Sequence, residues 1–187
     1  MRTALLTLLC LTASSAVFAG ELNIPSPPFT IMQKGAPPIQ LSQLKGKITV
    51  LTFIHTTCPH CQALTMGMNG VARDYMPKGV QFIECAFNEN AENLVAQFVQ
   101  TFHPTFPVGY SNLPTVKAYL DFSSMDKKMF YVPHMVFLDA KGNIRGDYAG
   151  ESEFMKNPEA NVRMELDKML AAPAPAPATA ASKTKKK

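Results

Sequence analysis

A run of uncharged residues in the first half of the chain predicts a buried strand that leads into a helix. Residues 48–54, Ile-Thr-Val-Leu-Thr-Phe-Ile, are apolar or β-branched, which is typical of a strand buried on both faces. From residue 61 onward, apolar side chains recur at spacings of three and four, as in a helix with one apolar face. These side chains are Cys61, Leu64, Met68, Val71 and Tyr75.

The same order of strand and helix is repeated directly afterwards. Residues 80–87 predict a second strand, and Leu94, Phe98 and Phe102 share one face of a second helix, which Pro104 ends. Two consecutive strand–helix units indicate a parallel arrangement of strands covered by helices. We therefore expect an α/β fold.

Shorter elements are predicted before this central part. Residues 29–31 and 39–41 indicate two short strands joined by a turn that contains Gly and Pro. Ser42 is expected to cap a single helical turn that Gly46 closes.

The second half of the chain predicts a short strand at 106–110, a short helix at 114–122 and then a hairpin. The hairpin strands are residues 135–138 and 144–148. A last helix begins at Asn157-Pro158, where a capping residue precedes a proline at the first helical position. Its inward-facing residues are expected to be Val162, Leu166, Met169 and Leu170.

Both ends of the sequence differ in composition from the part between them. Residues 1–19 hold a basic residue and an apolar run that ends in small residues, which predicts a secretory signal peptide cleaved after Ala19. Residues 172–187 alternate Ala and Pro and then become rich in Lys, so a disordered tail is expected. Residues 20–171 remain as one domain, long enough for one sizeable core.

The formal net charge of +4 arises at the two ends. Setting aside the five basic residues of the signal peptide and tail leaves 13 of the 18 basic residues against 14 acidic ones. A nucleic-acid-binding function therefore has little support. No later run approaches the ~20 apolar residues of a spanning helix, so we expect an exported chain, periplasmic or otherwise extracytoplasmic, without a transmembrane segment after cleavage.

Cys58, Pro59, His60 and Cys61 form a C-x-x-C motif where the first predicted strand turns into its helix. The Cys58 sulfur is expected near the unpaired N–H groups of the helix start, which favour a thiolate. Pro59 suits the first helical position because its missing N–H has no helical partner there. His60 adds a positive or hydrogen-bonding group beside the sulfur. Cys61 can close a disulfide with Cys58, so we expect Cys58 to attack and Cys61 to resolve.

A single C-x-x-C can also supply two ligands of a zinc or copper site. A structural zinc site needs four ligands, and no second cysteine pair is present in the sequence. The redox interpretation is preferred, with no metal and no cofactor other than the Cys58–Cys61 disulfide. Cys85, in the second predicted strand, is expected to be a buried, inert thiol.

Val132 and Pro133 directly precede the predicted strand at 135–138. A proline at this place is either the ordinary start of a strand or a cis-proline that faces the disulfide. We favour the cis-proline, which would expose the backbone of Val132 to an extended substrate.

With these motifs the chain resembles the TlpA/ResA branch of the thioredoxin superfamily over nearly all of residues 28–170. The resemblance is carried by Pro28-Phe29, residues 41–47, the strand before Cys58–Cys61, and Val132-Pro133 followed by residues 137–142. It implies a thioredoxin fold, a central mixed sheet flanked by helices, with an N-terminal β-hairpin and a strand–helix insertion before the cis-proline. It also implies disulfide exchange with exported client proteins that carry thiols or disulfides, and a membrane or soluble redox partner.

The chain departs from this family at positions that matter for proton transfer. Many relatives carry Glu three and Pro five residues after the second cysteine, where this chain has Leu64 and Met66. Thr52 stands where thioredoxins place a buried carboxylate. The proton acceptor for Cys61 is therefore unassigned. Glu84 in the second strand is one candidate, and the alternative is a carboxylate that faces the sheet edge or is satisfied by a neighbour.

Two other functions compete for the same residues. A copper-handling protein resembling Sco would use Cys58, Cys61 and a histidine such as His134, but Sco-like chains place three residues between the cysteines. A peroxiredoxin needs Thr three residues before its nucleophile, where this chain has His55. Disulfide exchange is preferred, with Sco-like copper binding as the alternative.

The sequence is compatible with either direction of electron flow. His60 and the helix start both favour the Cys58 thiolate, which belongs to the reduced form, so they predict an oxidising potential. The overall resemblance is instead to reductases. The remaining histidines, His55, His103 and His134, are expected only to cap or pack.

Overall fold

The computed structural model of the 187-residue chain describes residues 22–123 and 131–171. The predicted signal peptide at 1–19 and the predicted tail at 172–187 lie outside the described residues. Within the described ranges, no helix combines the length and the apolar character that crossing a membrane requires.

The central strand is β4, Ile48–Ile54, which has the bounds predicted from the sequence. It pairs in parallel with β5, Val80–Ala86, on one side and antiparallel with β7, His134–Leu138, on the other. All residues of β4 after Ile48 are buried. A continuous apolar run is what such a strand requires, because helices cover both of its faces.

The main sheet of the described residues has the strand order β1-β8-β7-β4-β5-β6. β6, Val108–Tyr110, is parallel to β5, whereas β8, Asn143–Tyr148, and β1, Ile24–Pro25, pair antiparallel with their neighbours. The sheet is therefore mixed, and the predicted fold class is confirmed. The two residues of β1 were not predicted, because so short a segment shows no period.

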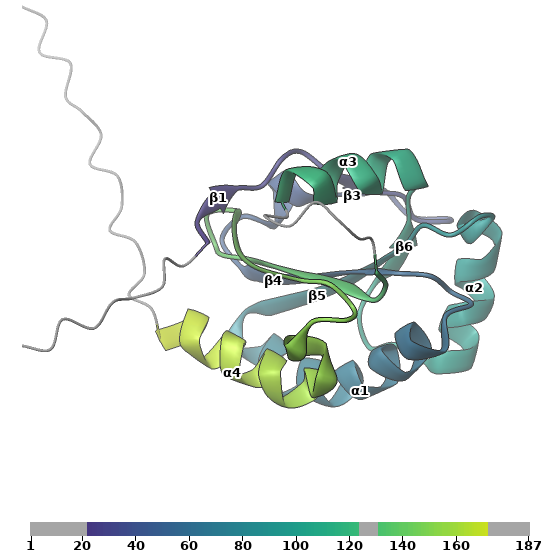
Figure 1. The fold of residues 1–187 in the computed structure, drawn as a ribbon. Coiled ribbons are helices and arrows are strands. Elements are labelled where there is room, and N and C mark those ends of the chain that lie inside the picture. The colour runs from purple at the N-terminus through teal and green to yellow at the C-terminus, as the bar shows by residue number, and fades with distance from the viewer. Residues whose placement is uncertain (1–21, 124–130, 172–187) are drawn as a thin grey trace, which may run out of the picture.

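Helices cover both faces of this sheet (Figure 1). α1, Pro59–Tyr75, and α4, Pro158–Ala171, lie on one face, and α3, Leu113–Ser123, lies on the other. α2, Ala91–Phe102, connects β5 to β6 and packs beside them at the edge of the sheet. The strand–helix units predicted from periodicity are thus β4-α1 and β5-α2.

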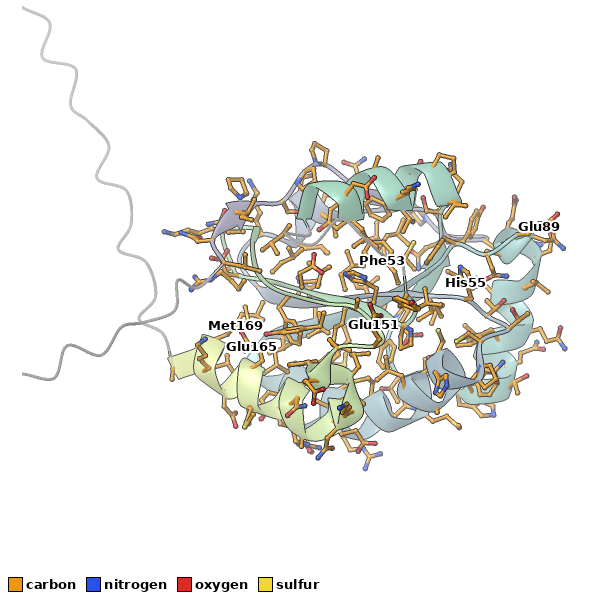
Figure 2. The ribbon with its side chains drawn as sticks, in the orientation of Figure 1. Phe53, His55, Glu89, Glu151, Glu165 and Met169 are labelled. Atoms are coloured by element: carbon orange, nitrogen blue, oxygen red, sulfur yellow. The ribbon has the colours of Figure 1, made fainter. Side chains whose placement is uncertain are left out.

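Each face of the sheet buries its own apolar core. Phe53 is central to the core beneath α3, with its ring centroid 5.4 Å from that of Phe29 and 5.5 Å from that of Tyr119 (Figure 2). The core beneath α1 and α4 includes Met68 and Leu166, at most 1% exposed. Burying each such side chain contributes about 1.5–3 kcal/mol to folding.

Several short elements complete the fold. β2, Thr30–Ile31, and β3, Ile39–Gln40, form the predicted two-stranded hairpin. They are followed by the 3-10 helix η1, Leu41–Leu44, and two further 3-10 helices are η2, Met76–Lys78, and η3, Glu153–Lys156.

Three local predictions differ from the structure. η1 has Gln40 as its N-cap, without a side-chain hydrogen bond, so the capping role predicted for Ser42 is wrong. The turn starts earlier because burial of Leu41 sets its place. In α2 the buried residues are Ala91, Val95 and Phe98, with Leu94 at the edge of the apolar face. Leu170, predicted to face inward, is 37% exposed in the last turn of α4.

The N-terminal hairpin is tied to the main sheet by an isolated bridge. Met32 and Tyr110 exchange two backbone hydrogen bonds, both 2.8 Å long. Gly109 makes this approach possible, because a Cβ there would stand 2.5 Å from both Ile31 Cγ2 and the Met32 carbonyl oxygen.

We predict that Gly109→Ala lowers the free energy of unfolding by about 1–3 kcal/mol, because the added methyl group displaces the hairpin. Urea denaturation checks this. Gly70→Ala is the matched control: a Cβ at Gly70 meets nothing within 4 Å, and helix propensity favours Ala over Gly by about 1 kcal/mol. Equal destabilisation by both substitutions would contradict the close packing at Gly109.

Candidate active site

The C-x-x-C motif lies at the start of α1. Cys58 is the N-cap residue, with φ −84° and ψ 119°, and Pro59 takes the first helical position as predicted. The Cys58 carbonyl accepts a hydrogen bond from the Gln62 N–H at 3.0 Å, and the Cys58 N–H donates to the His55 carbonyl at 3.1 Å. The Cys58 side chain therefore leaves the chain at the positive end of the helix dipole.

The two cysteines of the motif differ in exposure. Cys58 is half-buried, whereas Cys61 is 0% exposed, and both are thiols in this structure. Burial raises the pKa of Cys61, and the hydrogen bond and charge of Cys58 and the charge of Glu84 raise it further. A hydrogen bond with the His55 backbone acts in the opposite direction. Cys61 therefore keeps its proton and can share it with Cys58.

The segment before β7 lies against the motif. The Val132–Pro133 peptide bond is cis, as predicted. Val132 and Cys58 both pack against the apolar cluster that contains Cys61. Gly150, after β8, supports this segment, because a Cβ there would stand 3.0 Å from the Val132 carbonyl oxygen. The tertiary structure thus brings together residues that are far apart in the sequence.

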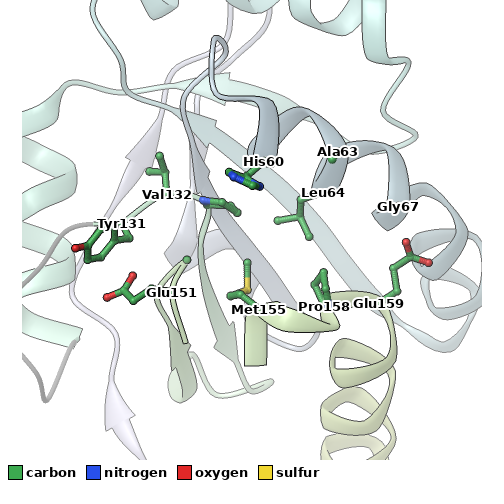
Figure 3. A pocket seen from close by; sticks show the side chains of 12 residues that line it. His60, Ala63, Leu64, Gly67, Tyr131, Val132, Glu151, Met155, Pro158 and Glu159 are labelled. Atoms are coloured by element: carbon green, nitrogen blue, oxygen red, sulfur yellow. The ribbon is translucent and has the colours of Figure 1, made fainter. Parts of the chain in front are cut away.

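A pocket of about 420 Å³ opens beside the motif. In Figure 3, His60 and Leu64 of α1 lie on one side and Pro158 at the start of α4 lies on the other. Val132 borders the pocket next to His60, and Met155 lies at its base. His60 is exposed, so its imidazole is accessible to a molecule bound in the pocket.

Two carboxylates line the same pocket. Glu151 follows Gly150, and Glu159 lies in the first turn of α4 (Figure 3). Both residues are exposed. The pocket therefore combines an apolar base with an acidic rim.

Glu84 is a buried carboxylate on the face of β5 directed at α1. Thr65 Oγ1 lies 2.9 Å from Glu84 Oε1, 3.0 Å from Glu84 Oε2 and 3.0 Å from the Cys61 carbonyl oxygen. Burial raises the pKa of Glu84 to about 8, against a lowering by the hydrogen bond from Thr65. Glu84 pairs with Thr52 on β4 and Val108 on β6, so the possibility that it faces a sheet edge is wrong. The possibility that a neighbour satisfies it is confirmed by the hydrogen bond from Thr65.

The histidines other than His60 pack, pair or cap a helix. His134 Nε2 lies 2.5 Å from Asp147 Oδ1, and both side chains are largely buried. The His55 ring packs edge-on against Phe87, with centroids 4.5 Å apart, and burial lowers the pKa of His55. His103 ends α2 in a left-handed conformation with φ 48°.

Cys85 is buried in β5, as predicted, on the face opposite to Glu84. Burial raises the pKa of its thiol. Over residues 22–123 and 131–171, no group of three or more His, Cys, Asp or Glu side chains is arranged to hold a metal. The expectation that the site needs no metal or cofactor stays a prediction.

Several residues of the site were missed in the sequence. Gly150 and Met155 reach it only through the chain reversal after β8. Thr65 was the one residue with a detectable signal, because a polar residue four positions after Cys61 falls on the same, otherwise apolar, face of the helix.

Comparison with known proteins places this site in a family. The chain is 31% identical to the thiol-disulfide oxidoreductase ResA of Oceanobacillus iheyensis over 96 residues, which are 51% of this chain and 50% of that protein. It is 29% identical to ResA of Bacillus cereus over 115 residues, or 57% of this chain and 66% of the relative. The chain thus spans about half to two thirds of these relatives' length.

A solved structure covers more of the chain. The thioredoxin-family thiol:disulfide interchange protein of Chlorobium tepidum superimposes on 79% of this chain and 99% of its own, with a TM-score of 0.63 and 25% identity. The sequence pattern of the Redoxin family matches residues 22–163, which include the C-x-x-C motif, the Val132–Pro133 segment and the whole sheet. The chain therefore belongs to the Redoxin family.

Proposed function

We propose that the protein is an exported thiol–disulfide oxidoreductase that exchanges disulfides with client proteins through Cys58 and Cys61. The observation that carries this function is the asymmetry of the motif. Cys58 is accessible at the N-terminus of α1, and Cys61 lies fully buried one turn behind it. This arrangement suits a nucleophile with a protected resolving thiol. The names of the ResA relatives support the same activity.

In the proposed reaction, the Cys58 thiolate attacks one sulfur of a client disulfide. The bond between Cys58 and that sulfur forms, the client disulfide breaks, and the other client sulfur leaves as a thiolate. Cys61 then attacks Cys58, closes the Cys58–Cys61 disulfide and releases the reduced client. The reverse sequence oxidises a client dithiol, so the redox partner decides the net direction.

Clients are proposed to bind along Val132 and Pro133. Val132 packs, as Cys58 does, against the apolar cluster that contains Cys61, and it borders the pocket beside His60. An extended client segment that pairs with the Val132 backbone would bring its sulfur toward Cys58. The apolar side chains that line the pocket, Leu64 and Met155, would receive a neighbouring client side chain.

The compartment and partners follow from the same proposal. Disulfides persist in oxidising compartments, so the predicted signal peptide at 1–19 and this chemistry are consistent with a periplasmic or other extracytoplasmic location. The proposed partners are client proteins and a membrane or soluble redox protein that restores the motif. The Cys58–Cys61 disulfide serves as the redox group, without a further cofactor.

Sco-like copper binding is not favoured. His134 is the histidine considered for that function, and its imidazole is engaged by Asp147 on the α3 side of the sheet. Cys61 lies on the opposite side, beneath α1.

We predict that Cys61→Ser accumulates a mixed disulfide with client protein, because Cys58 still attacks but no thiol resolves the product. Cys58→Ser is the matched control and should trap nothing, because the buried Cys61 is inaccessible. Non-reducing electrophoresis after exposure to an oxidised client measures both variants. Equal trapping by Cys61→Ser and Cys58→Ser would contradict the roles assigned to the two cysteines.

Cys85 should be an inert thiol. In the mature chain from Gly20, with the motif oxidised, the native protein is expected to react slowly with a thiol reagent. After unfolding, one thiol in each chain, that of Cys85, should react with the reagent. Rapid labelling of native protein, or a disulfide-linked dimer on a non-reducing gel, would contradict the burial of Cys85.

His60→Ala should make the protein a weaker oxidant, because the exposed imidazole at the second position of α1 no longer favours the Cys58 thiolate. A tenfold loss of thiolate stability would lower the reduction potential by about 30 mV. Equilibration with glutathione measures this. His103→Asn, at the far end of α2 where φ is 48°, is the control and should leave the potential unchanged. An unchanged potential in His60→Ala would remove the role of His60.

A further inference from the structure

Glu84 is a buried ionisable side chain to which the exchange reaction described above assigns no part. It is 1% exposed and lies inside the sheet. The residues that alternate with it on the same face of β5 are apolar: Val80, Phe82 and Ala86. A buried carboxylate without a cationic partner costs free energy that an apolar residue would not. A carboxylate at this position therefore suggests a chemical role.

Among residues 22–123 and 131–171, the surroundings of Glu84 offer one titratable neighbour. On β4 its register partner is Thr52, and on β6 it is Val108. From α1, Thr65 contacts the carboxylate, and Cys61 lies close enough for the charge of Glu84 to act on its thiol. The α2 side chains of the adjoining cluster are apolar: Ala91, Val95 and Phe98. Cys61, with Cys58 beyond it, is thus the group that can exchange a proton with Glu84.

The Thr65 hydroxyl lies between the Glu84 carboxylate and the backbone carbonyl of Cys61. It lies within hydrogen-bond distance of both Glu84 oxygens and of the Cys61 carbonyl oxygen, yet it carries only one hydrogen. When Glu84 is ionised, Thr65 donates to the carboxylate. When Glu84 is protonated, Glu84 can donate to Thr65 Oγ1, and the Thr65 hydrogen turns to the Cys61 carbonyl. Both protonation states of Glu84 therefore keep a hydrogen-bond partner in the dry interior.

We propose that Glu84 accepts the proton of Cys61 when Cys61 resolves the mixed disulfide at Cys58, and that Thr65 stabilises Glu84 in both protonation states. The proposal rests on the function proposed above. It places the proton-accepting carboxylate on β5. The neighbouring strand β4 carries Thr52 at the paired position.

In the proposed step one proton moves, one S–S bond forms and another breaks. The Cys61 S–H proton passes to the Glu84 carboxylate, and the Cys61 thiolate attacks Cys58 Sγ. The Cys58–Cys61 bond forms while the bond between Cys58 and the client sulfur breaks, and the client leaves with that electron pair as a thiolate. The enzyme dithiol is oxidised, and the client disulfide is reduced. In the opposite direction, protonated Glu84 returns the proton to Cys61.

The experiment separates the two chemical steps with oxidised glutathione as the disulfide probe. Reduced full-length mature protein is mixed with the probe, quenched with acid and analysed by mass. The parent should pass through the Cys58–glutathione mixed disulfide rapidly. Glu84→Gln should form it at an unchanged rate but resolve it about tenfold or more slowly near pH 7, because the amide cannot accept a proton. Equal resolution rates in parent and variant at every pH would overturn the proposal.

The pH profile distinguishes proton transfer from a packing effect. In the parent, the resolution rate should rise as Glu84 ionises, toward about pH 8. In Glu84→Gln the rise should move to higher pH, because Cys61 must ionise unaided. Glu153→Gln, an exposed carboxylate on η3, is the control and should retain the parent profile. If no mixed disulfide forms even in the parent, the proposed function fails first and this proposal with it.

Thr65 variants test the connection without removing the carboxylate. Thr65→Val loses the hydrogen bond that lowers the Glu84 pKa, so the resolution profile should move to higher pH. Thr65→Ser retains a hydroxyl and should restore the parent profile. Identical profiles for Thr65→Val and Thr65→Ser would remove Thr65 from the proposal. These variants also test Glu84 if Glu84→Gln does not fold.

Stability measurements give a readout that needs no exchange activity. The pKa of Glu84 is raised in the folded state from an ordinary 4.5 to about 8, so the unfolded chain ionises first as pH increases. Relative to Glu84→Gln, the parent should lose stability as pH rises through this window and no further above it. Parallel stability curves for parent and variant would show that Glu84 does not bind a proton at neutral pH.

Discussion

The hydrogen bonding of β4 to strands on both sides sets the geometry of the whole site. β4 cannot slide along its axis without breaking the parallel ladder to β5 and the antiparallel ladder to β7. The end of β4 therefore fixes the position of Cys58, at the start of α1, relative to the neighbouring strands. The register pair Phe53 and His134 places the beginning of β7, and with it Val132–Pro133, at the same end of the sheet.

The two faces of the sheet carry different chemistry because different helices cover them. The face beneath α3 is an aromatic and aliphatic core, in which Cys85 is one more apolar side chain. The face beneath α1 holds polar groups at the motif end, where Thr65 and Glu84 lie under Cys61. The interior there has a low effective dielectric, so proton affinities depart from those in water. Burial raises the pKa values of Cys61, Glu84 and Cys85 alike, but only Cys61 and Glu84 share one face of the sheet, where the charge of Glu84 acts on the Cys61 thiol.

The site places an accessible cysteine and a buried cysteine within one helical turn. Cys58 lies at the helix N-terminus, where unpaired N–H groups favour negative charge, and Val132 packs against the same apolar cluster as Cys58. Cys61 points into the core, where burial keeps it protonated until a base is available. A buried carboxylate close behind it meets that need, at the expense of stability, and the apolar packing on both faces of the sheet offsets the cost.

Local pattern was sufficient for part of this protein. Period and composition predicted β4 at its exact bounds, the helices α1, α2 and α4, and the cysteine motif at the start of α1, because each depends on residues close in sequence. The cis peptide bond at Pro133 was predicted from its place before a strand, together with the motif. Contacts between residues far apart in the sequence depend instead on the tertiary structure. Whether Glu84 faced an edge or the interior depended on β6 pairing beyond β5, and its approach to Thr65 and Cys61 depended on how α1 packs over that strand. Such contacts join residues about twenty or more positions apart, and only the assembled sheet, which sets the strand register and the neighbours of each strand, brings them within hydrogen-bond distance.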